Sequence, residues 1–271
     1  MSKFDARAVF LGGVLAVLPG LAQAEDLLAH RAVYDLVLLR ADSGSGISGL
    51  EGRFVAASWR TECGGWIVET RTVLDLAMAD RPSVTTDRRT LGEEGPGRSF
   101  YRFEAATLYD GHPVERAEGN AEWVGDALRV HYAEPARGDL PIDPEALFPQ
   151  AFSEELLKAA RLGQRMVVGT VFDGSAGEDG ERYLSAVLSR AETAPPALAT
   201  LAGLPEGALG WQVSMAFFVP GGADALPVFR SRFFMLENGV LADLELDYGR
   251  YVLAGTLQQV TPLPLEACFS R

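Results

Sequence analysis

Short runs of alternating apolar and polar residues recur along almost the whole chain, and this pattern constrains the fold more than any other feature. In such a run the apolar side chains share one face of an extended strand and the polar ones share the other. Gly, Asp and Pro separate the runs and favour turns. The runs cover residues 31–39, 52–59, 65–76, 99–108, 120–132, 165–172 and 182–189. Many short strands at this spacing predict an all-β fold built from a mainly antiparallel sheet.

The clearest single piece of structure is a hairpin around Asn238 and Gly239, which suit the two central positions of a type I′ turn. A turn of this kind imposes a register on the flanking strands. The register pairs Arg232 with Glu245, Arg230 with Asp247, Phe233 with Leu244, and Phe229 with Tyr248. One face of the hairpin is then polar and the other is apolar, as expected for a sheet with one solvated side.

Three acidic residues on the second strand of this hairpin, Asp243, Glu245 and Asp247, resemble a metal or general-acid cluster. In the predicted register, however, Glu245 and Asp247 each face an arginine. We therefore favour a structural interpretation, in which the carboxylates form cross-strand ion pairs on a solvated face.

One α-helix is predicted, over residues 152–163. Ser153 is expected to cap its start and Gly163 to end it, and the charged residues near each end suit the helix dipole. Its narrow apolar stripe is expected to pack on the sheet and consists of Leu156, Leu157, Ala159 and Ala160. The Ala- and Pro-rich segment 191–210 is expected to be a long loop, and the glycine-rich segment 43–52 a flexible connector.

The first 24 residues have the pattern of a cleavable secretory signal peptide. Lys3 and Arg7 precede an apolar run over residues 8–18, and small residues lead up to the expected cleavage after Ala24. The run is too short for a membrane-spanning helix, which needs about 20 apolar residues. A buried N-terminal helix is the alternative. The pattern favours export to the periplasm.

The mature chain, residues 25–271, is predicted to be a single domain with no further membrane-spanning segment. The full sequence carries 24 basic and 37 acidic residues, a formal net charge of −13. Such a charge argues against nucleic acid as a partner. Lys158 is the only lysine after the signal peptide, and no polybasic cluster exists to hold an anionic membrane surface.

The chain contains two cysteines, Cys63 and Cys268. In an oxidising compartment an even number of cysteines usually indicates a disulfide. The alternative is a pair of separately buried thiols, since free cysteine is among the most buried residue types. A redox role is disfavoured because Glu62, rather than a basic residue, lies beside Cys63.

The sequence contains no recognisable catalytic, cofactor-binding or metal-binding motif. No G-x-S-x-G nucleophile motif occurs, and the glycine-rich segment 43–52 is not followed by the helix and lysine of a phosphate-binding loop. His30, His112 and His131 lack zinc-site spacing, and we place His112 in a turn and His131 in a strand. The tryptophans are expected to be core residues more than ligand platforms: Trp59, Trp66, Trp123 and Trp211.

Several separated strings resemble the EipB-like family of periplasmic cell-envelope integrity proteins of alphaproteobacteria. In chain order they are AHRAVYDLVL, GLEGRFVAASWRTECGGWIVETR, LFPQAF, VFDGS and TPLPLEACF. The resemblance covers nearly all of the mature chain. It implies a strongly curved, spiral- or barrel-like antiparallel sheet closed by a disulfide between Cys63 and Cys268. It also implies a role in maintaining the Gram-negative envelope without known catalysis.

These observations lead to one functional hypothesis and two alternatives. The favoured hypothesis is a non-enzymatic periplasmic protein that binds another envelope component, such as a protein, lipoprotein or lipid, and needs no cofactor or metal. The first alternative is a carrier that holds a lipid or the acyl chain of a lipoprotein on the concave apolar face of the sheet. The less favoured alternative is a hydrolase of envelope polymers that uses two carboxylates.

Overall fold

The computed structural model describes residues 27–136, 139–174, 180–219 and 226–268, and the predicted signal peptide lies outside them. The described residues form a single antiparallel sheet of 15 strands, which confirms the predicted all-β fold. The strands are β1 His30–Ala41, β2 Ile47–Arg60, β3 Trp66–Met78, β4 Val84–Glu94, β5 Phe100–Tyr109, β6 His112–Val124, β7 Ala127–Glu134, β8 Leu140–Ile142, β9 Met166–Phe172, β10 Glu181–Leu188, β11 Glu192–Thr193, β12 Leu209–Phe218, β13 Phe229–Leu236, β14 Leu241–Asp247 and β15 Tyr251–Pro262. The helical segments are α1 Pro149–Arg161, α2 Pro196–Leu201 and the short 3₁₀ segment η1 Pro96–Arg98.

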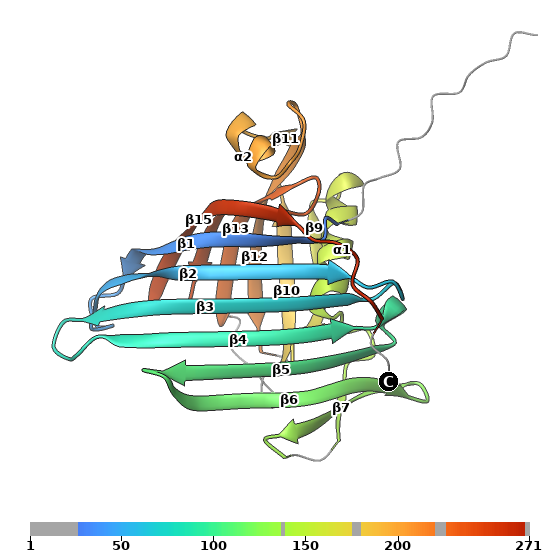
Figure 1. Cartoon of the computed structure of the whole chain (residues 1–271), viewed down its shortest axis with the longest axis horizontal. Helices are drawn as coiled ribbons and strands as arrows, with labels where there is room; N and C mark the ends of the chain where they lie inside the picture. The colour runs from blue at the N-terminus through green and yellow to red at the C-terminus, as the bar shows by residue number, and fades with distance from the viewer. Residues whose placement is uncertain (1–26, 137–138, 175–179, 220–225, 269–271) are drawn as a thin grey trace, which may run out of the picture.

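The strand order is β8-β7-β6-β5-β4-β3-β2-β1-β15-β14-β13-β12-β10-β9, with β11 paired to β12. Because the sheet is strongly curved, β1 to β7 form a front layer and β9, β10, β12 and β13 run behind it (Figure 1). Helix α1 lies at one end of the space between the layers (Figure 1). We call this the helix end of the molecule, and the opposite end, where β3 turns into β4, the far end.

The two outermost strands of the sheet are joined by the segment that follows β8. Leu147 forms a parallel bridge with Val171 of β9. Its N–H donates to the carbonyl of Thr170 at 2.9 Å, and its own carbonyl accepts the N–H of Phe172 at 2.9 Å. The side chain of Asp143 also accepts a hydrogen bond from the Thr170 hydroxyl at 2.8 Å. A short stretch of main chain therefore connects the sheet's two ends and gives it a barrel-like form.

Buried side chains fill much of the interior in three clusters. The largest joins α1 to both layers and includes Trp66, Phe152, Leu157, Trp211 and Phe233. The second lies under β5, β6 and β7, and half of its buried residues are aromatic, among them Tyr101, Phe103, Phe148 and Phe172. The third is small and contains Leu36, Leu50, Leu74 and Leu253.

Helix α1 begins earlier than the sequence predicted, at Pro149, and ends at Arg161. Proline is well suited to the first helical position because the N–H it lacks would have no partner there. The predicted cap, Ser153, is wrong: its hydroxyl donates instead to the carbonyl of Pro149 at 3.0 Å, within the helix. Gly163 follows the helix with a φ of +73°, as a terminating glycine should.

Other boundaries also differ from the prediction. The run 120–132 divides into the end of β6 and most of β7, because Gly125, with a φ of +63°, turns the chain between them. The expected loop 191–210 contains β11 and α2. The connector 43–52 is shorter than expected, since β2 already begins at Ile47.

The turn of the β13–β14 hairpin is one residue longer than predicted. The N–H of Leu236 donates to the carbonyl of Val240 at 2.9 Å, so the turn holds three residues, with Gly239 at a φ of +84°. The predicted two-residue type I′ turn is therefore wrong. A register shift between Arg232 and Phe234 follows, where the Phe233–Leu244 alignment was expected.

Beyond this shift the predicted register holds. Arg230 lies opposite Asp247 and Arg232 opposite Glu245, with ion-pair distances of 2.7 and 3.6 Å. Asp243, the remaining acidic residue of the triplet, has a φ of +50° at the irregular part of the strand. The shift thus compensates for the extra turn residue and restores the pairing.

Candidate functional site

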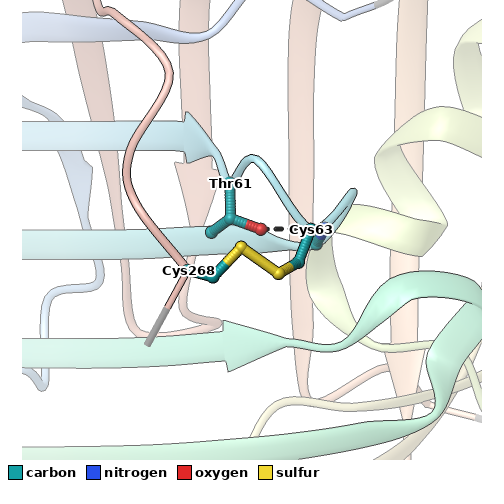
Figure 2. The surroundings of a disulfide bond; sticks show 4 residues. Thr61, Cys63 and Cys268 are labelled. Atoms are coloured by element: carbon teal, nitrogen blue, oxygen red, sulfur yellow. Dashed lines mark hydrogen bonds between the residues drawn. A yellow bond between two sulfur atoms is a disulfide. The ribbon is translucent and has the colours of Figure 1, made fainter. Parts of the chain in front are cut away.

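The predicted disulfide joins Cys63, in the turn between β2 and β3, to Cys268 in the segment after β15 (Figure 2). The Cα atoms lie 5.7 Å apart, and 205 positions separate the residues in sequence. Main-chain hydrogen bonds of Glu266 to Arg60 and Glu62, each 2.9 Å long, hold the tail beside the turn. Both cysteines are exposed, so the alternative of two buried thiols is wrong. The bond fixes the tail at the helix end.

A cavity of about 520 Å³ lies at the helix end, between α1 and the ends of β3 and β4. It falls within the size range of small-molecule sites. The described residues that line it are Leu27, Arg60, Gly64, Trp66, Glu94, Gly95, Gly97, Arg98, Ala151, Glu154, Leu157, Lys158 and Arg161. We call it the helix-end cavity.

One face of α1 forms a wall of this cavity. Ala151, Glu154, Lys158 and Arg161 follow one another at intervals of three or four residues and therefore lie on the same side of the helix. The opposite side carries the buried leucine and phenylalanine side chains that hold α1 in the main core. The helix is thus anchored by its apolar face and presents charged groups to the cavity.

Three side chains from different elements meet on the cavity wall. The indole N–H of Trp66 donates to Glu154 Oε1 at 2.9 Å, and Arg60 Nη2 reaches the same oxygen at 3.4 Å. The guanidinium of Arg60 also lies over the Trp66 ring, 4.6 Å from its centroid. Such stacking holds a guanidinium in a defined plane, which favours directional recognition of an oxyanion.

Glu94, at the end of β4, is the most buried ionisable group of the cavity, with only 4% of its surface exposed. Its two carboxyl oxygens accept hydrogen bonds from the main-chain N–H groups of Gln150 and Ala151, at 2.6 and 3.1 Å. Glu94 therefore caps α1 from a distant strand. Burial raises the pKa of Glu94 to about 7; the two hydrogen bonds lower it, and the charge of Glu154 raises it.

Arg98 enters the cavity from the segment between β4 and β5. It is one of few non-glycine residues with a left-handed backbone, at a φ of +61°. Its guanidinium donates to the carbonyls of Ala146 and Pro144, at 2.6 and 3.5 Å. Its own carbonyl accepts the indole N–H of Trp123 at 3.0 Å. Contacts at both ends of the residue offset the backbone strain and fix the side chain's position.

The far end differs in chemistry. Aromatic side chains of β12, β13, the β14–β15 turn and the start of β15 form a chain of ring contacts there: Phe217 to Phe229 at 5.5 Å, Phe229 to Tyr248 at 5.0 Å, and Tyr248 to Tyr251 at 5.0 Å. Tyr248 is 42% exposed, and the other rings are partly exposed. We call this set the far-end aromatic row.

Groups of β4 and β5 influence the ionisation of the far-end aromatic row. Loss of hydration raises the pKa of Tyr248 to about 12; the neighbouring Tyr251 raises it further and Arg88 of β4 lowers it. Tyr109 of β5 likewise raises the pKa of Tyr251, after desolvation. The row is thus a set of partly exposed rings within the field of an arginine.

The structure separates the other residues singled out in the sequence. His131 Nδ1 lies 2.9 Å from Asp139 on the surface, and His30 Nδ1 lies 2.7 Å from the carbonyl of Leu28. His112 begins β6, so its predicted place in a turn is wrong. Among the described residues, no group of three or more His, Cys, Asp or Glu side chains is arranged to hold a metal ion.

Two of the tryptophans are core residues, Trp66 and Trp211, each 4% exposed. Trp59 is partly buried and Trp123 is exposed. Trp66 also lines the helix-end cavity, so it is both a core residue and part of a candidate ligand site.

Glu94 and Arg98 are not singled out by any pattern described above for the sequence. A usable signal existed for Glu94, because it occupies an inward position of its strand: it pairs with Trp66 and continues the face of Thr90. An acidic residue at an inward position just before a Gly-Pro-Gly turn needs a partner inside the protein. Arg98 carries no comparable signal, since its partners are carbonyls 46 and 48 positions away.

Comparisons with known proteins cover most of the chain. A family model described as EipB-like matches residues 21–264. The cell envelope integrity protein EipB of Brucella abortus (strain 2308) is 31% identical over 256 residues, which cover 93% of this chain and 90% of that protein. A crystal structure of a beta-barrel-like protein of a domain of unknown function, also from Brucella abortus, matches with a TM-score of 0.82 at 30% identity, covering 89% of this chain and 100% of that one.

Proposed function

The chain belongs to the EipB-like family, and from this premise we propose that it supports cell-envelope integrity in the periplasm by binding another envelope component without catalysis. The relative's name supplies the process, and the disulfide suits an oxidising compartment. In the part of the chain that the structure covers, no helix is long and apolar enough to cross a membrane.

The observation that carries the proposal is the helix-end cavity. It is large enough for a small ligand or for one group of a larger partner, and charged side chains converge on it from β2, β4 and α1. Its described lining residues include no serine, threonine, cysteine or histidine, and its two carboxylates, Glu94 and Glu154, are engaged by main-chain N–H groups of α1 and by Trp66 and Arg60. The chemistry of the lining therefore favours binding over bond cleavage.

A cavity-filling variant tests this function in the native bacterium. In a strain that lacks the gene, Ala151→Trp should fail to restore resistance to a detergent such as deoxycholate, because the indole occupies the cavity. Ala77→Trp is the matched control, since Ala77 is exposed on β3. Both variants must first match the parent in abundance and thermal unfolding. Full restoration by Ala151→Trp would refute binding in this cavity.

The far-end aromatic row favours a second candidate, a lipid or lipoprotein carrier. Its partly exposed rings suit an acyl chain, whereas the interior towards α1 is filled by the main core cluster. Lipid extracted from protein purified from the periplasm should then be abundant in the parent and depleted in Phe229→Ala. A parent protein free of lipid would reject the carrier.

A further inference from the structure

The helix-end cavity has an excess of basic side chains, although the chain as a whole is acidic. The chain has 37 acidic and 24 basic residues, so its overall field repels anions. The described lining of the cavity has four basic side chains, Arg60, Arg98, Lys158 and Arg161, against two acidic ones, Glu94 and Glu154. This local excess of positive charge is concentrated in a concave site, where fields are strongest.

The acidic side chains of the cavity already accept hydrogen bonds from the protein and are therefore unsuited to bind a cation. Both oxygens of Glu94 accept main-chain N–H groups at the start of α1. Glu154 accepts the indole N–H of Trp66 and lies beside Arg60. These hydrogen bonds therefore hold the elements of the cavity wall together.

The basic side chains are placed at different depths. Arg60 is oriented by stacking on Trp66, and Arg98 by two main-chain carbonyls. Lys158 is more exposed, and its only described ion pair, with Glu155 of the same helix at 3.2 Å, is solvated and weak. Two oriented guanidinium groups and a more exposed ammonium on one cavity supply the kind of donors that an oxyanion needs, because arginine forks bind carboxylate and phosphate in a directional way.

We propose that the helix-end cavity binds an acidic group of an envelope component, a phosphate or a carboxylate, with Arg60 and Arg98 as the oriented donors and Lys158 at the entrance. The proposal rests on the binding function above and specifies the chemistry of its ligand. The apolar edges of Trp66, Leu27 and Leu157 line the same cavity and would contact the part of the ligand next to the acidic group.

The sequence provides a direct probe of this site. Lys158 is the only lysine after residue 24, so reductive methylation with ¹³C-formaldehyde labels one side chain, in the cavity, besides the terminal amine. Dimethyl-lysine keeps its positive charge. The methyl resonance of the disulfide-bonded protein starting at Glu25 is followed by NMR during titration with sodium phosphate, sodium acetate or chloride at constant ionic strength. Co-flotation with phosphatidylglycerol or phosphatidylcholine vesicles tests lipid-borne phosphate.

Arg60→Gln is the test variant and Arg53→Gln its matched control. Each removes one positive charge, but Arg53 lies on the exposed face of β2, paired with Asp35 at 3.0 Å. We expect saturable shifts with phosphate or acetate but not chloride, about ten-fold weaker binding in Arg60→Gln, and unchanged binding in Arg53→Gln; ten-fold corresponds to one lost charge-assisted hydrogen bond. Both variants must have the circular dichroism spectrum of the parent and an intact disulfide.

Each outcome decides the proposal. Binding of phosphate together with phosphatidylglycerol vesicles supports a lipid headgroup; binding of phosphate without the vesicles supports a soluble phosphate; and binding of acetate alone supports a carboxylate. Absence of saturable shifts with both anions, or equal weakening in both variants, overturns it. If the cavity binds anions but Arg60→Gln fully restores detergent resistance, the ligand chemistry stands and the proposed function of the cavity fails.

Discussion

The two ends of the curved sheet differ in how the interior is closed. At the helix end, α1, the disulfide and a capping glutamate close the interior and leave a charged cavity. At the far end no helix covers the described aromatic rings, which remain partly exposed. The helix end is therefore held by many independent long-range contacts, and the far end mainly by strand pairing and ring contacts. We expect substitutions to reveal this difference as a gradient of stability.

The largest effect is expected from the double substitution Cys63→Ala/Cys268→Ala. In the chain-entropy model, opening a loop of 205 residues lowers the free energy of unfolding by about 5 kcal/mol, a large share of the 5 to 15 kcal/mol typical of a domain. Urea unfolding monitored by tryptophan fluorescence measures the change. A loss below about 1 kcal/mol would mean that the sheet, and not the bond, holds the helix end together.

A pair of substitutions on one strand compares the two ends directly. Phe233 and Phe229 both lie on the inward face of β13, but Phe233 is buried in the main core and Phe229 is only partly buried at the far end. Phe233→Ala should cost about 4 kcal/mol and Phe229→Ala about 1 kcal/mol, since the cost follows the buried area and the cavity created. Equal losses in urea unfolding would show that the far end is packed as tightly as the helix end.

The pH dependence of stability tests the cap at the helix end. The pKa of Glu94 is raised from 4.5 to about 7 in the folded protein, so between these values the folded state binds more protons than the unfolded state. Its contribution is therefore complete below about pH 4.5 and is lost as the pH rises through 7, a fall on the order of 3 kcal/mol.

Glu94→Gln should remove this fall, since the amide does not titrate. His30 contributes the opposite slope: desolvation lowers its pKa, so its neutral form favours the folded state as pH rises. The difference between parent and variant, measured by urea unfolding from pH 4 to 8, isolates Glu94. Parallel profiles for the two proteins would show that Glu94 does not titrate in this range.

Prediction from the sequence was correct where short-range patterns encode the structure. Alternation predicted the strands, and the export pattern with two cysteines predicted the disulfide. It failed where distant residues decide local structure. Helix α1 starts at Pro149 because Glu94 of β4 accepts hydrogen bonds from its first N–H groups, and no local sequence pattern indicates that partner. The helix-end cavity was missed for the same reason, since Arg60, Arg98 and Lys158 meet only after the sheet curves. The curvature itself was anticipated through family resemblance.

The smallest effect is expected on the outer face of the far end. Arg232 and Glu245 form an exposed pair 3.6 Å apart, whose Coulomb attraction is screened by water and opposed by side-chain entropy. Glu245→Gln should therefore change the free energy of unfolding by less than about 0.5 kcal/mol and leave detergent resistance intact. Asp247 has more partners, because it also accepts the N–H of Gly249 at 2.8 Å, so Asp247→Asn should cost more. If Glu245→Gln instead abolished detergent resistance at unchanged stability, the acidic strand would be a functional surface, and the contrast between a charged helix end and an aromatic far end would have to be redrawn.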